Sequence, residues 1–287
     1  MNLDIEIEIG ESDFKNQICK EINLVIGDHY SDRKTTPKFI IPLDFQEKVR
    51  EISGETNYQA SRQISNQSAF GITFKEKGVI ILNSELFKNP IDTQIRANFY
   101  HHEYFHFIYE KIEKEYNLST KKGQYDSFVN FYIEEYNAIR HGLIQAIRGF
   151  DNQTEPFIGF MKMVSEGHFR NLTNKNLYYN YLKKEISDYK NRRCTLEDLL
   201  CKIFPKIKSY TLDLISFDVY NEIASDIFHF EVFEDEFFNE KSRQFPRILE
   251  NQLGNNQELY ILDQYFKNFG ITLKDTSEGL YFEIDFV

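Results

Sequence analysis

The sequence predicts an α+β fold in which a small sheet packs against two long helices and a mainly helical region follows. Short apolar segments with strand character lie before residue 83, and stretches with apolar residues three and four positions apart follow from about residue 90. The chain has 287 residues, of which 41% are hydrophobic and 16% aromatic. This composition excludes a disordered chain and is sufficient for one large core or two smaller ones.

The first half of the chain alternates strands with helices. We predict a strand at residues 3–9, helices at 12–24 and 44–52, and a hairpin whose strands at 72–74 and 79–82 flank a turn ending at Gly78. Two long helices follow, at about 90–117 and 124–148. The first begins where Asn89-Pro90 offers a cap and a first-turn proline, and neither Gly nor Pro interrupts it before Gly123.

The second half of the chain shows mostly helical periodicity. We predict helices at 155–166, 176–190, 195–208, 211–230 and 256–268, with breaks at Gly167, Asn191 and Pro205, and a final hairpin at 271–273 and 280–286. The predicted domains are residues 1–150 and residues 151–287. The second region carries no readable motif, and we expect it to regulate the first or to bind a partner.

His102, Glu103 and His106 form an H-E-x-x-H pattern on the first long helix. Histidines four positions apart lie about 40° apart around a helix, so both imidazoles can bind one metal ion. Glu103 follows the first histidine, where it can take a proton from a water molecule that the metal activates. Phe99 and Tyr109 recur on the same stripe, which predicts that the histidines face the core.

A catalytic zinc site needs a third protein ligand, and Glu135 on the second long helix is the candidate. Its neighbours on the same face are apolar, aromatic or small: Phe128, Phe131, Tyr132, Ala138, Ile139 and Gly142. A carboxylate on such a face needs a cation, because an unpaired buried charge is costly. The cation is zinc or, alternatively, Arg140 or Arg96 in an ion pair. Glu134 is the alternative ligand.

The two segments together resemble a known family. His102-Glu103-Tyr104-Phe105-His106 followed by Glu135-Tyr136-Asn137-Ala138 is similar to the H-E-x-x-H and E-x-x-A arrangement of gluzincin-type zinc metallopeptidases. The lead-in Val79-Ile80-Ile81-Leu82-Asn83 and Phe99 resemble the ImmA/IrrE-like branch, whose members include peptidases that cut repressor proteins. The likeness covers roughly residues 66–150. It implies a zincin-like catalytic domain and Zn²⁺ as cofactor.

The resemblance implies a zinc-dependent endopeptidase that hydrolyses a peptide bond in a protein substrate such as a regulator or repressor. His102, His106 and Glu135 would bind the metal, and Glu103 would be the general base. Four residues are candidates for stabilising the developing oxyanion: Tyr132, Tyr136, Arg140 and His141. The alternative function is a catalytically silent zincin-fold sensor or partner-binding protein.

Charge and hydropathy bound the remaining possibilities. The formal net charge is −11, which disfavours nucleic acid as a partner because phosphates select basic surfaces. No apolar run reaches the length of a membrane span, and the acidic alternating N-terminal segment differs from a signal peptide. Three cysteines without metal-clip spacing fit a reducing compartment. We therefore expect a cytoplasmic protein whose partners are a protein or peptide substrate and a regulatory protein.

Overall fold

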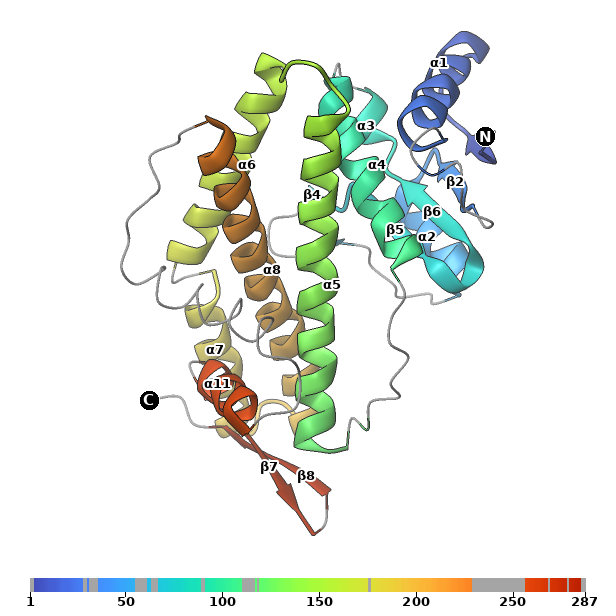
Figure 1. Cartoon of the computed structure of the whole chain (residues 1–287). Coiled ribbons are helices and arrows are strands. Elements are labelled where there is room, and N and C mark those ends of the chain that lie inside the picture. The colour runs from blue at the N-terminus through green and yellow to red at the C-terminus, as the bar shows by residue number, and fades with distance from the viewer. Residues whose placement is uncertain are drawn as a thin grey trace. The chain divides into compact units, whose positions relative to one another are not determined.

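The chain has an α+β architecture, mostly helical with a small mixed sheet, and forms two compact units. The computed structural model describes residues 3–27, 30, 36–54, 61–62, 67–88, 91–109, 117, 119–174, 177–228, 256–267, 269–277 and 279–284 (Figure 1). Unit 1 comprises Met1–Glu110 and Asn137–Met163, and unit 2 comprises Lys111–Tyr136 and Val164–Val287. The second long helix belongs to both units, and the division into domains at residue 150 stays a prediction.

The sheet of unit 1 has the strand order β1-β2-β6-β5. β1 (Ile5–Ile7), β2 (Lys38–Ile41) and β6 (Val79–Leu82) are parallel, and β5 (Gly71–Phe74) pairs antiparallel with β6 at the edge. The predicted hairpin is thereby confirmed, with the short 3₁₀ turn η2 (Lys75–Lys77) between its strands. β2, a short apolar run between Pro37 and Pro42, was not predicted from the sequence.

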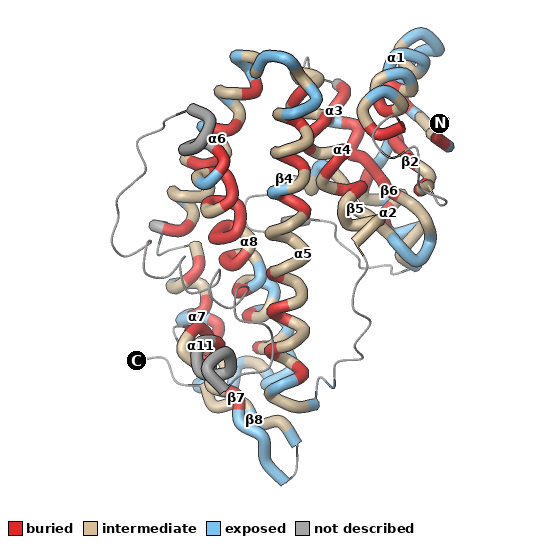
Figure 2. Tube along the Cα trace, viewed as in Figure 1, coloured by how far each residue is buried: buried red, intermediate tan, exposed pale blue. Residues whose placement is uncertain are grey.

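Helices cover both faces of this sheet. Ile80 and Leu82 pack in a cluster with residues of α1 (Ser12–Ile22) and α4 (Thr93–Ile108), whereas Ile81 packs with Phe45 of α2 (Phe45–Ser53). Successive strand residues point to opposite faces, so an uninterrupted apolar run is expected when both faces are buried. Figure 2 shows the resulting buried residues along α4 and the strands.

The helix that carries the H-E-x-x-H pattern is shorter than predicted. α4 begins at Thr93, where the side chain of Asp92 accepts a hydrogen bond of 2.8 Å from Gln94 N. It ends at Ile108, because Tyr109 takes an extended backbone with ψ 111°. The predicted span of 90–117 was therefore wrong at both ends. Residues 89–90 and 110–116 lie outside the described part of the chain.

The second long helix, α5 (Lys121–Arg148), runs from unit 2 into unit 1. The remaining short elements of unit 1 are the π-helical turn η1 (Asn23–Gly27), the two-residue strands β3 (Ser61–Arg62) and β4 (Gln67–Ser68), and α3 (Glu85–Lys88). α6 (Glu155–Thr173) also belongs to both units. It continues through Gly167, so the predicted break there was wrong.

Unit 2 is mainly helical, as predicted for this part of the chain. It contains α7 (Tyr179–Lys190), α8 (Leu196–Phe228), α11 (Asn256–Lys267) and the hairpin of β7 (Ile271–Thr276) with β8 (Gly279–Ile284). The predicted break at Pro205 was wrong, because α8 continues through it. Cys201, four residues earlier, is exposed, so the carbonyl that loses its partner to proline lies on the solvent side.

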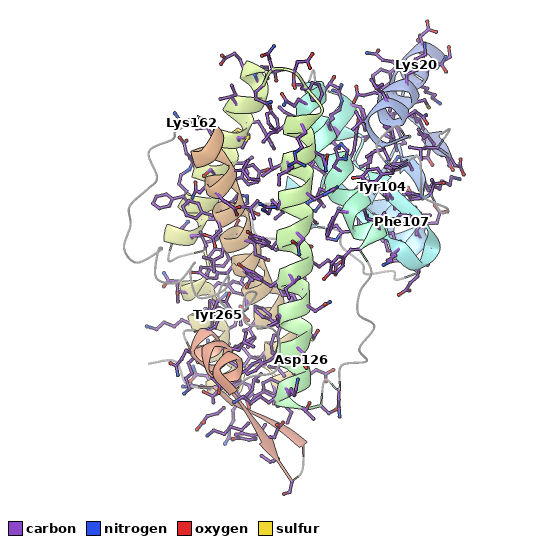
Figure 3. The ribbon with its side chains drawn as sticks, viewed as in Figure 1. Lys20, Tyr104, Phe107, Asp126, Lys162 and Tyr265 are labelled. Carbon is purple, nitrogen blue, oxygen red and sulfur yellow. The ribbon has the colours of Figure 1, made fainter. Side chains whose placement is uncertain are left out.

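The core of unit 2 is aromatic around Tyr265, which is labelled in Figure 3. Its ring contacts those of Phe128, Phe266 and Phe269, and its hydroxyl lies 2.6 Å from Thr211 Oγ1. Among the described residues, no helix combines the length and the apolar character needed to cross a bilayer.

Candidate metal centre

The two histidines of the H-E-x-x-H pattern direct their ring nitrogens toward each other. His102 Nε2 lies 3.2 Å from His106 Nε2, and the rings meet at 75° with centroids 4.9 Å apart. Both side chains are half-buried, while the buried side of α4 includes Ala97, Tyr100 and Tyr104. The prediction that the histidines lie on the core-facing stripe was therefore wrong. A half-buried position suits a metal ligand, since a catalytic ion must be reached by substrate.

Glu135 on α5 completes a three-residue group with these histidines. The ligand atoms of His102, His106 and Glu135 all lie within 4.8 Å of one another. α5 is continuous across the boundary between the units, and its later residues Ala138 and Gly142 are buried within unit 1. The sequence-predicted ligand set is thus brought together, whereas the alternative ligand Glu134 is not part of the group.

Gly142 allows α5 to approach α4 closely beside His102. A Cβ atom added at Gly142 would lie 2.6 Å from Asn98 O and 3.2 Å from His102 Cβ. Real Cβ atoms do not approach a carbonyl oxygen this closely, so the position requires glycine unless the helices move apart. The absence of a side chain at Gly142 therefore helps to set the spacing of the helices that carry the candidate ligands.

The donor set fits zinc. Zinc in proteins is bound by imidazole nitrogen at about 2.0–2.1 Å and by carboxylate oxygen at about 2.0–2.2 Å in a tetrahedral arrangement. Two nitrogens bound to one tetrahedral zinc are therefore about 3.3 Å apart, which matches the 3.2 Å between His102 Nε2 and His106 Nε2. The same contact also suits a hydrogen bond from one neutral imidazole to the other, so the distance is compatible with zinc without requiring it.

The arginines considered as partners for Glu135 differ in their surroundings. Arg96 forms a two-point ion pair with Glu21, with Nε to Oε1 at 2.7 Å and Nη2 to Oε2 at 2.6 Å. Burial alone would lower the pKa of Arg96, but the hydrogen bonds and charge of Glu21 outweigh it and raise the pKa. Arg140 is exposed. The alternative of an Arg96–Glu135 ion pair is therefore disfavoured, because Glu21 already neutralises this guanidinium.

Glu103 is buried, with 7% of its surface exposed, and lies against the edge strand β5. The hydroxyl of Thr73 lies 2.8 Å from Glu103 Oε2 and 2.9 Å from the carbonyl oxygen of the same residue. A Cβ added at Gly71 would lie 2.6 Å from Glu103 Cγ. Strand β5 therefore fixes the position of the predicted general base through a hydroxyl and a missing side chain.

The four oxyanion candidates lie in different surroundings. Tyr132 is 1% exposed, and burial raises its pKa, with a further contribution from the charge of Asp218. Tyr136 donates a hydrogen bond of 2.9 Å to Glu222, and His141 Nε2 lies 2.6 Å from the hydroxyl of Tyr30. Arg140, the fourth candidate, is the exposed residue of the set. Nothing in these contacts selects one of the four for the role.

Comparisons of the chain with models of protein families, with curated proteins and with solved structures gave no match. The likeness to gluzincins therefore depends on the residues described above.

The structure adds three residues to the site that sequence reasoning missed: Gly71, Thr73 and Tyr30. Gly71 and Thr73 alternate along β5, so they share the strand face that meets Glu103. This alternation is visible in the sequence, but the helix that faces it is not. Tyr30 precedes His101 by 71 positions, and no local pattern marks it.

Proposed function

We propose that the protein is a zinc-dependent endopeptidase of the gluzincin type, with a zincin-like catalytic domain. His102, His106 and Glu135 would hold the zinc, and Glu103 would be the general base. The observation that carries the proposal is the convergence of two imidazoles and one carboxylate within 4.8 Å, next in sequence to a buried glutamate. Two neutral nitrogens and one carboxylate are a donor set of known zinc hydrolases.

Bound zinc would polarise the substrate carbonyl and lower the pKa of water. Glu103 takes a proton from the water that attacks the peptide carbonyl, and it then delivers that proton to the amine that leaves when the C–N bond breaks. Thr73 donates to Glu103 Oε2, which restricts rotation of the carboxylate. A base held in one orientation needs less rearrangement to reach the transition state.

The edge strand supports a peptide as substrate. β5 is the last strand of the sheet and carries Thr73, which contacts the general base. An extended peptide that adds to this edge would gain main-chain hydrogen bonds without needing a particular sequence. The hairpin thus links the candidate base with a strand suited to an extended chain. This arrangement favours an endopeptidase over a hydrolase of small molecules.

Two measurements test the proposal. The first is zinc content after dialysis of the metal-free protein against a slight excess of Zn²⁺, for which we expect one equivalent. The second is cleavage of fluorescently labelled unfolded casein by the wild type and by Glu103→Gln. The variant should keep the zinc and lose at least about 100-fold in cleavage rate, which is the usual contribution of a general base.

The outcomes of these two measurements distinguish the peptidase from its alternatives. Less than about a tenth of an equivalent of zinc in the wild-type protein would refute the metal centre. Full zinc occupancy without cleavage of casein or of a random peptide mixture would favour the silent sensor over the peptidase. Equal cleavage by the wild type and Glu103→Gln would show that Glu103 is not the base.

A further inference from the structure

The hydroxyl of Tyr30 contacts two histidines that come from different helices. It lies 2.6 Å from His141 Nε2 on α5 and 3.3 Å from His101 Nδ1 on α4. A hydroxyl has one proton, so it can donate to one ring nitrogen and accept from an N–H on the other. Tyr30 therefore joins α4 and α5 through a single oxygen atom. All three residues belong to unit 1.

The side chains of this trio, Tyr30, His101 and His141, are held by packing. The ring of Tyr30 stacks on Tyr104 with centroids 4.1 Å apart, and His101 is 2% exposed. The ring of His141 also contacts Phe105, with centroids 5.2 Å apart. Tyr104, labelled in Figure 3, packs in the cluster that includes residues of the sheet. The trio is therefore anchored to the core of unit 1, and its hydroxyl has little freedom to move.

On α4 the trio adjoins a candidate ligand, and on α5 it adjoins the glycine at the helix contact. His101 directly precedes the candidate ligand His102, and His141 directly precedes Gly142, where α5 closely approaches Asn98 and His102 of α4. At about 100° per residue, His101 and Glu103 project about 200° apart around α4. Tyr30 therefore lies on the other side of this helix from the general base. It does not meet the reacting atoms, so its role differs from catalysis.

We propose that Tyr30 is a positioning residue for the metal, because its hydroxyl fixes how α4 and α5 cross. This proposal rests on the proposed zinc site. Bringing Glu135 to the two histidines requires the helices to be held within a fraction of an ångström of one arrangement. Gly142 lets the helices approach, and the Tyr30 hydroxyl holds them at that approach. Removing this hydroxyl weakens zinc binding because the helices are held less tightly, although all three candidate ligands are still present.

The test measures zinc affinity by competition with a chromophoric chelator at pH 7.5. Tyr30→Phe removes the hydroxyl and keeps the ring that stacks on Tyr104. We expect its zinc dissociation constant to rise about tenfold, the lower end of the effect of outer-shell partners. The matched control is Tyr100→Phe, which removes a buried hydroxyl of α4 that donates to Glu21 at 2.8 Å and does not reach α5. Its dissociation constant should stay within about twofold of the wild type.

A double-mutant cycle separates positioning from general destabilisation. His141→Leu removes both ring nitrogens and so the other end of the shorter contact, and Tyr30→Phe should have little further effect in its presence. It also serves as the second test if Tyr30→Phe does not fold. Thermal unfolding of the metal-free variants is measured alongside, because a purely structural tyrosine would lower the melting temperature and leave the zinc affinity unchanged.

Three outcomes would overturn the proposal. One is a zinc affinity of Tyr30→Phe within about twofold of the wild type, and another is an equal loss in Tyr100→Phe. The third is full additivity of the two changes in the cycle. If the wild type binds no zinc, the proposed function fails and this inference fails with it. If the wild type binds zinc and Tyr30→Phe binds equally well, this inference alone fails.

Discussion

The hydroxyl of Thr73 lies 2.8 Å from Oε2 of Glu103 and 2.9 Å from the carbonyl oxygen of the same residue. One hydroxyl on the edge strand therefore contacts both the side chain and the backbone of the residue that follows His102. The relationship couples the position of the sheet edge to the orientation of the candidate base. A peptide that pairs with this edge would meet a carboxylate whose direction is already set.

Thr73→Val tests this coupling, because valine has nearly the same shape and lacks the hydroxyl. We expect the cleavage rate of unfolded casein to fall about tenfold or more, while zinc affinity stays within about twofold of the wild type. The reason is that Thr73 orients the base and contacts none of the candidate ligands. Thr73→Ser restores the hydroxyl and should recover most of the rate. A Thr73→Ser variant as slow as Thr73→Val would assign the effect to packing.

The choice between the two adjacent glutamates gives a second prediction. Glu135→Gln should weaken zinc binding at least 10-fold, because it replaces a charged oxygen donor by a neutral one, whereas Glu134→Gln should leave it unchanged. Zinc added at about 1,000 times its dissociation constant should stabilise the wild type by about 4 kcal/mol. Thermal unfolding with and without zinc measures how much the metal stabilises the wild type and each variant. Loss of the zinc effect in Glu134→Gln alone would move the third ligand to Glu134.

Much of the fold follows from local patterns in the sequence. The hairpin of β5 and β6 was predicted because two apolar runs flank a turn that ends at Gly78, whose positive φ of 65° favours glycine. The centre of the sheet was not predicted. β2 has only four residues, and its pairing with β1 and β6 joins distant parts of the chain. Periodicity cannot reveal such a strand.

The residues of the candidate site were likewise predicted only in part. His102 and His106 were predicted as a pair because their spacing is local, and Glu135 because its apolar neighbours lie within two turns of one helix. Thr73 and Tyr30 were missed, because their contacts with Glu103, His101 and His141 exist only after distant segments pack. The candidate ligands could be predicted from helical spacing, whereas the contacts of Thr73 and Tyr30 depend on tertiary structure.

Gly142→Ala gives a third prediction. The added methyl group would lie 2.6 Å from Asn98 O, so α5 must move away from α4. We expect a loss of about 1–3 kcal/mol in stability, typical of overpacking, and weaker zinc binding. Gly159→Ala on α6 is the matched control, since nothing lies within 4 Å of a Cβ there and alanine favours a helix by about 0.5–1 kcal/mol. Denaturant unfolding and chelator competition measure both effects. Equal stability of Gly142→Ala and the wild type would contradict the close approach.

The last prediction concerns pH and Glu8 in unit 1. Leu43 N donates to Glu8 Oε2 at 3.0 Å, and this bond lowers the pKa of Glu8, with a smaller contribution from Lys48. A lowered folded-state pKa gives stability that is present above the ordinary value of 4.5 and is lost as the pH falls through the folded value. Because Glu8 is exposed and water screens its charge, Glu8→Gln should cost no more than about 0.5 kcal/mol at pH 7 and almost nothing at pH 3. Denaturant unfolding at both pH values measures the difference in stability.

Glu51→Gln is the control, because Glu51 is 65% exposed and contacts Lys48 on the surface, so its replacement should have little effect on stability. An equal loss in Glu8→Gln at pH 7 and pH 3 would show that the charge of this carboxylate is not the source of the stability.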